Sequence, residues 1–201
     1  MERLFARLVS FVFHPFLIPT IGFTLLFSFA GHLVYIPMTM KSIVLVIAFS
    51  STCFLPILSF AALSLNKKFD PFVNKSRDRI IPLLFTGVYY YMGYYLLGRI
   101  PATGLFRIML LASLVVILIS LMVSAYWKIS IHMAGMGGLL GAVLAISFRY
   151  GLNPGVIVPA LIVGTGLLAH SRIYLEKHSP TQVYAGLSMG MIVMYSILYF
   201  I

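Results

Sequence analysis

Long apolar stretches, separated by short polar ones, run along the whole chain. Seven of them cover residues 10–33, 41–65, 81–98, 105–127, 132–149, 154–170 and 182–201. A helix rises 1.5 Å per residue, so about 20 apolar residues cross the roughly 30 Å hydrocarbon core of a bilayer. The pattern therefore predicts an all-α, polytopic membrane bundle of six to seven transmembrane helices. No linker or change of composition divides residues 1–201, which we interpret as one domain.

Prolines and glycines refine this picture inside the runs. The first run contains Pro15 and Pro19, so we expect it to begin at the membrane interface and to kink as it enters. Two later runs carry glycines at helical spacing, namely Gly135, Gly137, Gly138 and Gly141 in one, and Gly186 and Gly190 in the other. Small residues let membrane helices approach closely, so we interpret these glycines as packing positions.

Composition agrees with a membrane protein. Of the 201 residues, 61% are hydrophobic and 9% are charged, which leaves too few polar groups to cover a soluble globule. The single cysteine, Cys53, excludes an intrachain disulfide framework. The basic start of the chain has no small-residue cleavage site after it, so it is expected to be a retained helix rather than a signal peptide.

The polar stretches fall on one side of the predicted membrane. Residues 66–80, 128–132 and 171–182 follow the second, fourth and sixth runs, and two crossings separate each stretch from the next. By these spans, ten of the fourteen Lys and Arg residues lie on that face. The positive-inside rule favours the cytoplasm for such a face. Several of these cations are also candidate substrate ligands, so the side of the membrane stays open.

The segment from His170 to Gln182, HSRIYLEKHSPTQ, is the most polar part of an otherwise apolar chain. Charged groups in or beside a membrane are costly and usually bind something. Arginine donates paired hydrogen bonds to phosphate oxygens, and Arg172 stands six residues before His178. If the turn is helical, the Gln182 amide oxygen accepts the Nδ1 proton of His178 and leaves Nε2 free to attack phosphorus.

A second histidine, His132, completes a metal-free scheme for phosphate chemistry. Imidazole titrates near neutral pH and can protonate a leaving oxygen. The four acidic residues, Glu2, Asp70, Asp78 and Glu176, form no pair that would hold a metal, so no metal and no other cofactor is expected. Simpler interpretations stay open: His178 as an interfacial histidine, Arg172 as a snorkelling side chain, and the 66–80 cations as attraction for anionic lipid.

Three groups of residues resemble the motifs of the membrane-bound type 2 phosphatidic acid phosphatases. Ser171, Arg172 and His178 match the family's serine-arginine, five residues, histidine, with Gln182 where the family has aspartate. Ser130 and His132 match the serine and histidine of proline-serine-glycine-histidine. A looser match pairs Lys75 and Arg79 with the family's lysine, six residues, arginine-proline. Together these groups span residues 75–182.

The resemblance implies a role for each matched residue. His178 would form a phosphohistidine, and His132 would protonate the departing alcohol and then activate water. The phosphoryl oxygens would be held by Lys75, Arg79, Arg172, Ser130 and Ser171. Gln182 would orient the His178 ring but, being neutral, would not stabilise its positive charge.

We therefore expect an integral protein of a bacterial inner membrane that hydrolyses a lipid phosphate monoester or diphosphate. Phosphatidate-like, phosphatidylglycerophosphate-like and polyprenyl diphosphate-like substrates all remain open. The expected partners are the lipid phosphate and the bilayer, with no nucleic acid. Two alternatives remain: a catalytically weak relative that binds or moves an anionic lipid, and a lipid phosphotransferase.

Overall fold

The computed structural model describes residues 1–31, 33, 36–65 and 79–201, and 81% of these residues are helical, with no strand among them. The elements, in chain order, are α1 (Glu2–Val12), α2 (Ile18–Phe29), α3 (Met38–Phe49), the π-helical turn η1 (Ser50–Phe54), α4 (Leu55–Ser64), α5 (Ile80–Leu97), α6 (Gly104–Ser124), α7 (Ile131–Tyr150), α8 (Ile157–Tyr174) and α9 (Pro180–Phe200). The predicted all-α membrane bundle is confirmed.

Six helices of the described chain are long and apolar enough to cross a membrane, and α3, η1 and α4 together make one of them, Met38–Ser64. The first predicted span, residues 10–33, was wrong as a single helix, because it is divided into parts of α1 and α2. Pro15 explains the division, since proline has no backbone N–H and disfavours a helical residue before it. At 1.5 Å per residue, the twelve residues of α2 rise about 18 Å, which is short of the bilayer core.

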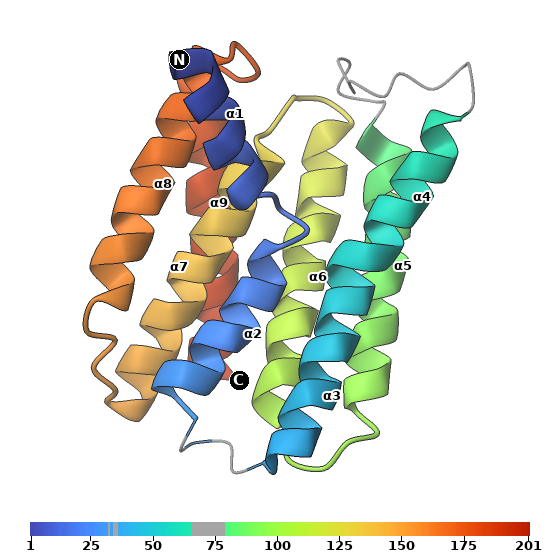
Figure 1. Ribbon diagram of the computed structural model, residues 1–201, viewed down its shortest axis with the longest axis vertical. Helices are drawn as coiled ribbons and strands as arrows, with labels where there is room; N and C mark the ends of the chain where they lie inside the picture. Colours follow the sequence, from blue (N-terminus) through green and yellow to red (C-terminus); the bar gives the residue numbers. More distant parts are fainter. Residues whose placement is uncertain (32, 34–35, 66–78) are drawn as a thin grey trace.

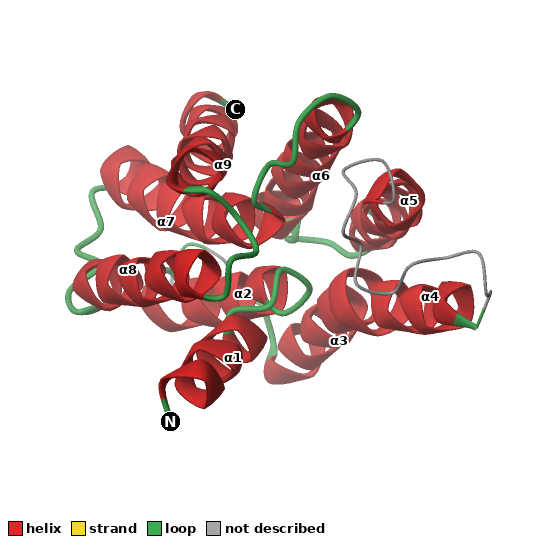
Figure 2. Cartoon of the chain, turned by 90° about the horizontal axis from the view of Figure 1, so that it is seen from above, coloured by secondary structure: helices red, strands yellow, loops and turns green. Residues whose placement is uncertain are grey.

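The helices run up and down the long axis of the molecule, so alternate connections lie at the same end (Figure 1). The upper end in Figure 1 holds α1, the end of α4, the start of α5, and the connections α6–α7 and α8–α9. Viewed from this end, α1 lies beside α8 (Figure 2), on which it packs. The predicted grouping of the polar stretches on one face is therefore confirmed for their described residues.

Helices α7 and α9 make the closest pairing in the bundle, and glycine is the reason. A Cβ atom on Gly137 would lie 2.0 Å from the Leu187 carbonyl oxygen, and one on Gly190 would lie 2.0 Å from that of Ala134. These are impossible distances, so the two backbones touch where side chains would otherwise hold them apart. This contact confirms the interpretation of these glycines as packing positions.

The π-helical turn η1 fixes the start of α2. Pro56 cannot donate to the carbonyl of Thr52, and its ring crowds that carbonyl, which accounts for a widened turn at this point. The Thr52 side chain points from this turn toward the start of α2. It donates to the Phe16 carbonyl oxygen at 3.4 Å and lies 3.3 Å from the Thr20 hydroxyl. Thr52 thus secures the break between α1 and α2.

Candidate active site

A polar cavity of about 290 Å³ opens at the end of the bundle where the polar connections meet. Three imidazoles and two guanidinium groups line it: His14, His132, His178, Arg79 and Arg172. They come from the α1–α2 break, the start of α5, the start of α7, the end of α8 and the α8–α9 turn. Residues far apart in sequence therefore converge on one space, and none of the described residues that line it is acidic.

The α8–α9 turn holds His178 in a defined orientation. Its Nδ1 atom lies 3.1 Å from Gln182 Oε1, which is the predicted hydrogen bond. The backbone N–H of Ser179 donates to the same oxygen at 3.2 Å. An N–H group can only donate, so this atom is the amide oxygen, and Nδ1 of His178 must carry the proton. The Nε2 lone pair of the neutral ring is then free to act as a nucleophile.

Gln182 also caps the first turn of α9. The Gln182 N–H donates to the Ser179 hydroxyl at 3.4 Å, and with the Ser179 N–H bond this completes a capping box. A single side chain therefore sets both the first turn of the helix and the tautomer of His178.

Burial, reinforced by Arg79 and Arg172, lowers the pKa of His178 to about 4. Burial and the nearby Arg172 likewise lower the pKa of His14 to about 4. Because protonation would add a cation beside two guanidinium groups, His178 stays neutral at physiological pH. It is therefore in the protonation state that nucleophilic attack requires.

We expect Gln182→Glu to move the acidic limb of the kcat/KM profile to higher pH. In the native chain, activity falls as pH drops through the His178 pKa of about 4, because the protonated ring cannot attack. A carboxylate at position 182 favours the imidazolium ion and raises that pKa. A charge-assisted bond also stabilises the charge that develops in attack, so turnover at pH 7 should rise about tenfold.

The measurement is phosphate release between pH 3.5 and 8, with Gln182→Met as the control of similar length that has no strong acceptor. Gln182→Met should lower turnover. Identical pH profiles for the native chain and Gln182→Glu would show that this contact does not control His178.

Both arginines line the cavity. Arg79 Nη1 donates to the Ile129 carbonyl oxygen at 2.8 Å, which ties the start of α5 to the α6–α7 connection. Burial lowers the Arg79 pKa. Arg172 Nε is buried and has no hydrogen-bond partner among the residues that the structure describes. An unpaired buried donor is costly, so a site of this kind is suited to an anion such as phosphate.

His132 and His14 lie against each other, with ring centroids 5.2 Å apart and the rings nearly perpendicular. The His14 Nδ1 atom accepts the Phe16 N–H at 3.4 Å. Sequence reasoning placed His132 in the site and missed His14. The available signal was its position directly before Pro15, at a helix break on the same membrane face as His178.

The other predicted ligands are placed differently. Lys75 lies outside the described residues. The Ser171 hydroxyl donates to the Leu167 carbonyl oxygen of its own helix at 2.7 Å. Ser130 is fully buried, and its Oγ has no partner within the described part of the chain. Neither serine is among the residues that line the cavity.

Lys128, in the α6–α7 connection, is a further cation that sequence reasoning did not assign to the site. Burial, together with Arg79, Lys177 and Arg172, lowers its pKa. Two of these three residues, Arg79 and Arg172, line the cavity, although Lys128 itself does not. The local field is therefore more positive than the lining residues alone indicate.

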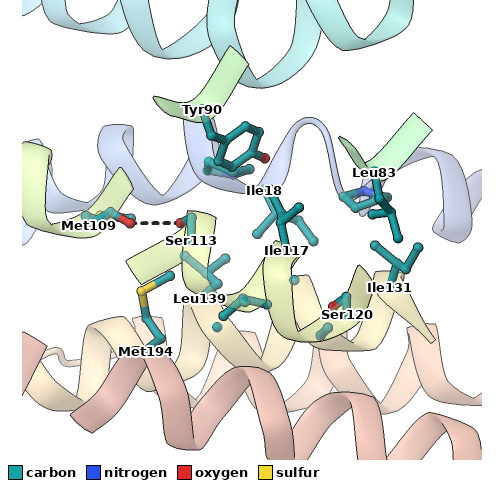
Figure 3. Close-up of a pocket in the computed structure, with 16 residues that line it drawn as sticks. Ile18, Leu83, Tyr90, Met109, Ser113, Ile117, Ser120, Ile131, Leu139 and Met194 are labelled. Atoms are coloured by element: carbon teal, nitrogen blue, oxygen red, sulfur yellow. Dashed lines mark hydrogen bonds between the residues drawn. The ribbon is translucent and has the colours of Figure 1, made fainter. Parts of the chain in front are cut away.

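An apolar cavity adjoins the polar one, and the two share Pro15, Leu83 and Ile131. Figure 3 shows the residues that line the apolar cavity. Three residues with hydroxyl groups, Tyr90, Ser113 and Ser120, line it, and the Ser113 hydroxyl donates to the Met109 carbonyl oxygen of its own helix at 2.8 Å. The volume is about 60 Å³. An apolar cavity of about 150 Å³ is needed to admit a benzene ring. The space is therefore too small for a lipid tail, and its mostly apolar residues bound the polar cavity on this side.

No group of three or more metal-ligating side chains is arranged to hold a metal ion within residues 1–31, 33, 36–65 and 79–201. Comparisons with models of protein families, with curated proteins and with solved structures find no match to this chain. The function is therefore inferred from the residues that line the cavity and from their chemistry.

Proposed function

We propose that this membrane protein is a lipid phosphate phosphatase that works through a phosphohistidine on His178. The observation that carries the proposal is the cavity in which His178, with Nδ1 held by Gln182, faces Arg79, Arg172 and His132. Phosphate esters resist attack because their oxygens are negative, so catalysis depends on positioning and on cations. The cavity offers both.

The reaction has two steps. The His178 Nε2 lone pair forms a bond to phosphorus as the bond from phosphorus to the leaving oxygen breaks. The negative charge of the bound phosphate offsets the positive charge of Arg79 and Arg172, so that His132 can carry a proton in the complex and give it to the leaving oxygen. Water then attacks the phosphohistidine, His132 takes back a proton, and the N–P bond breaks to release phosphate. Arg79 and Arg172 hold the phosphoryl oxygens throughout.

The location of the cavity supports a lipid substrate. It lies at one end of a bundle whose outer surface is apolar, with exposed residues such as Ile81 and Leu84 on α5 close to Pro82 and Leu83 in the cavity wall. A molecule with a hydrocarbon tail in the bilayer and a phosphate at its surface can present that phosphate here. The resemblance to the type 2 phosphatidic acid phosphatases, which rests on Ser171, Arg172 and His178, favours the same substrate class.

Gln182 supports one alternative, a relative that binds an anionic lipid without hydrolysing it. An amide orients the His178 ring as the structure describes. It does not supply the negative charge that stabilises an imidazolium, a difference of about ten- to a hundredfold in rate. Tight binding of a lipid phosphate without turnover would favour this alternative.

The test is phosphate release by the purified protein from a panel of lipid phosphates, measured with a metal chelator present. We expect release from at least one member of the panel, and a phosphoryl group on the protein that is labile in acid and stable in base, as phosphohistidine is. The matched inactive control is Arg172→Gln, which keeps hydrogen-bonding capacity but removes the charge. If no member is turned over, or if turnover requires added metal, the proposed function is wrong.

A further inference from the structure

A second polar cavity adjoins the first. It has a volume of about 530 Å³, and His14, His132 and Arg172 line both spaces. Its other cations are Arg3 and Arg7 from α1, and Lys177 from the α8–α9 turn. His132, which acts as the general acid in the proposed reaction, thus stands on the wall between two cationic spaces.

Helix α1 is positioned to present its arginines. Ala6 and Val9 are buried, and α1 packs on α8. Arg3 and Arg7 are four residues apart, so both lie on the side of α1 that lines the cavity. The Glu2 carboxylate accepts a hydrogen bond from the Tyr174 hydroxyl at 3.0 Å, which joins the start of α1 to the end of α8.

The charge of this cavity selects an anion. Among the described residues, four cations line it, Arg3, Arg7, Arg172 and Lys177, against one acid, Glu176. In the described part of the chain, two buried donors at its wall, Arg172 Nε and the Ser10 hydroxyl, have no hydrogen-bond partner. Guanidinium groups pair with phosphate oxygens through parallel hydrogen bonds. The cavity is therefore built to hold a phosphate beside the one that reacts.

We infer that the second cavity binds the leaving phosphate of a lipid diphosphate, so that the bridging oxygen lies at His132 between the two spaces. The inference rests on the proposed function. His178 Nε2 bonds to the terminal phosphorus, the bond from that phosphorus to the bridging oxygen breaks, and His132 protonates the oxygen. A lipid monophosphate leaves, and water then releases inorganic phosphate from His178 while His132 recovers its proton.

The exposed side of α1 offers the lipid tail a path from the second cavity to the bilayer. Phe11 lines the second cavity and is 71% exposed, and Leu4 and Leu8 are also exposed. A tail can leave the cavity along these side chains into the bilayer. The apolar cavity of Figure 3, at about 60 Å³, does not compete for it.

The experiment compares farnesyl diphosphate with farnesyl monophosphate, which share one tail, as substrates of the native chain and of the double variant Arg3→Gln/Arg7→Gln. Loss of two charge-assisted contacts should lower kcat/KM for the diphosphate by about 30-fold or more. The loss of kcat/KM for the monophosphate should be several-fold smaller. Both arginines are exposed, so folding should be preserved. The control, Lys41→Gln/Arg99→Gln, removes one cation near the start of α3 and one just after the end of α5. The start of α3 and the end of α5 lie at the opposite end of the bundle (Figure 1).

Binding separates this inference from the proposed function. Farnesyl methylenediphosphonate, which cannot be hydrolysed, should bind the native chain about tenfold more tightly than farnesyl phosphonate, and Arg3→Gln/Arg7→Gln should remove that preference. Selective binding without any turnover would support the second site while contradicting the phosphatase. Equal losses for both substrates, or equal binding of both phosphonates, would overturn the inference, since α1 would then attract anionic lipid in general.

Discussion

Replacement of His178 by alanine is expected to lower phosphate release by at least a factor of about 1,000, because it removes the group that forms the bond to phosphorus. The imidazole is 7% exposed, with Nδ1 engaged by Gln182, so Nε2 is the ring nitrogen left to react. Initial rates on the best lipid phosphate of the panel measure the loss. The acid-labile phosphoryl group on the protein should disappear with it.

His170→Ala is the matched control. His170 lies eight residues earlier, near the end of α8, where its exposed ring stacks on Tyr174 with centroids 5.9 Å apart. It should keep nearly native turnover, because its ring lies on the outside of α8. Release by His178→Ala at the native rate would refute the phosphohistidine mechanism. An equal loss in both variants would indicate a general requirement for a sound α8–α9 turn.

Gly137→Ala and Gly190→Ala are expected to destabilise the bundle strongly. The added methyl would lie 2.0 Å from a backbone carbonyl oxygen in each case, and neither helix can yield without moving the whole of α7 away from α9. Overpacking of this kind typically costs about 1–3 kcal/mol, and a clash with backbone belongs at or above the upper end. We expect a marked fall in melting temperature in detergent, together with loss of activity.

Gly166→Ala supplies the same methyl group without the clash. Nothing lies within 4 Å of the Cβ position at Gly166, which is in the interior of α8. Alanine there should be neutral or should stabilise by up to about 1 kcal/mol, since glycine is the weaker helix former. Melting temperatures unchanged in Gly137→Ala and Gly190→Ala would mean that α7 and α9 pack less closely than the structure describes.

Hydropathy predicted the long helices because a membrane leaves few other ways to satisfy a backbone. It failed over residues 10–33, where apolar content continues through Pro15 although the helix does not. A window average records transfer free energy and is insensitive to one missing N–H group. Pro15 and Pro19 predicted only a kink, whereas the chain has a full break between α1 and α2, and His14 lies in that break.

The site was predicted best where it is local. His178 and Gln182 are one helical turn apart, so their spacing nearly determined the contact. Ser171 and Arg172 show the opposite case. Successive side chains in a helix point about 100° apart, and here only one of the two lines the cavity. Arg172 faces it, and the hydroxyl of Ser171 bonds to its own helix.

The oxygen that Gln182 shares between His178 and the Ser179 N–H limits how this chain can change by mutation. An aspartate at position 182 would be one methylene shorter. Its carboxylate could not accept hydrogen bonds from both the Ser179 N–H and the His178 ring. A histidine–aspartate pair therefore cannot be reached by that single replacement without a compensating change in the α8–α9 turn. Ancestral or designed versions that carry an aspartate here should differ at neighbouring positions as well.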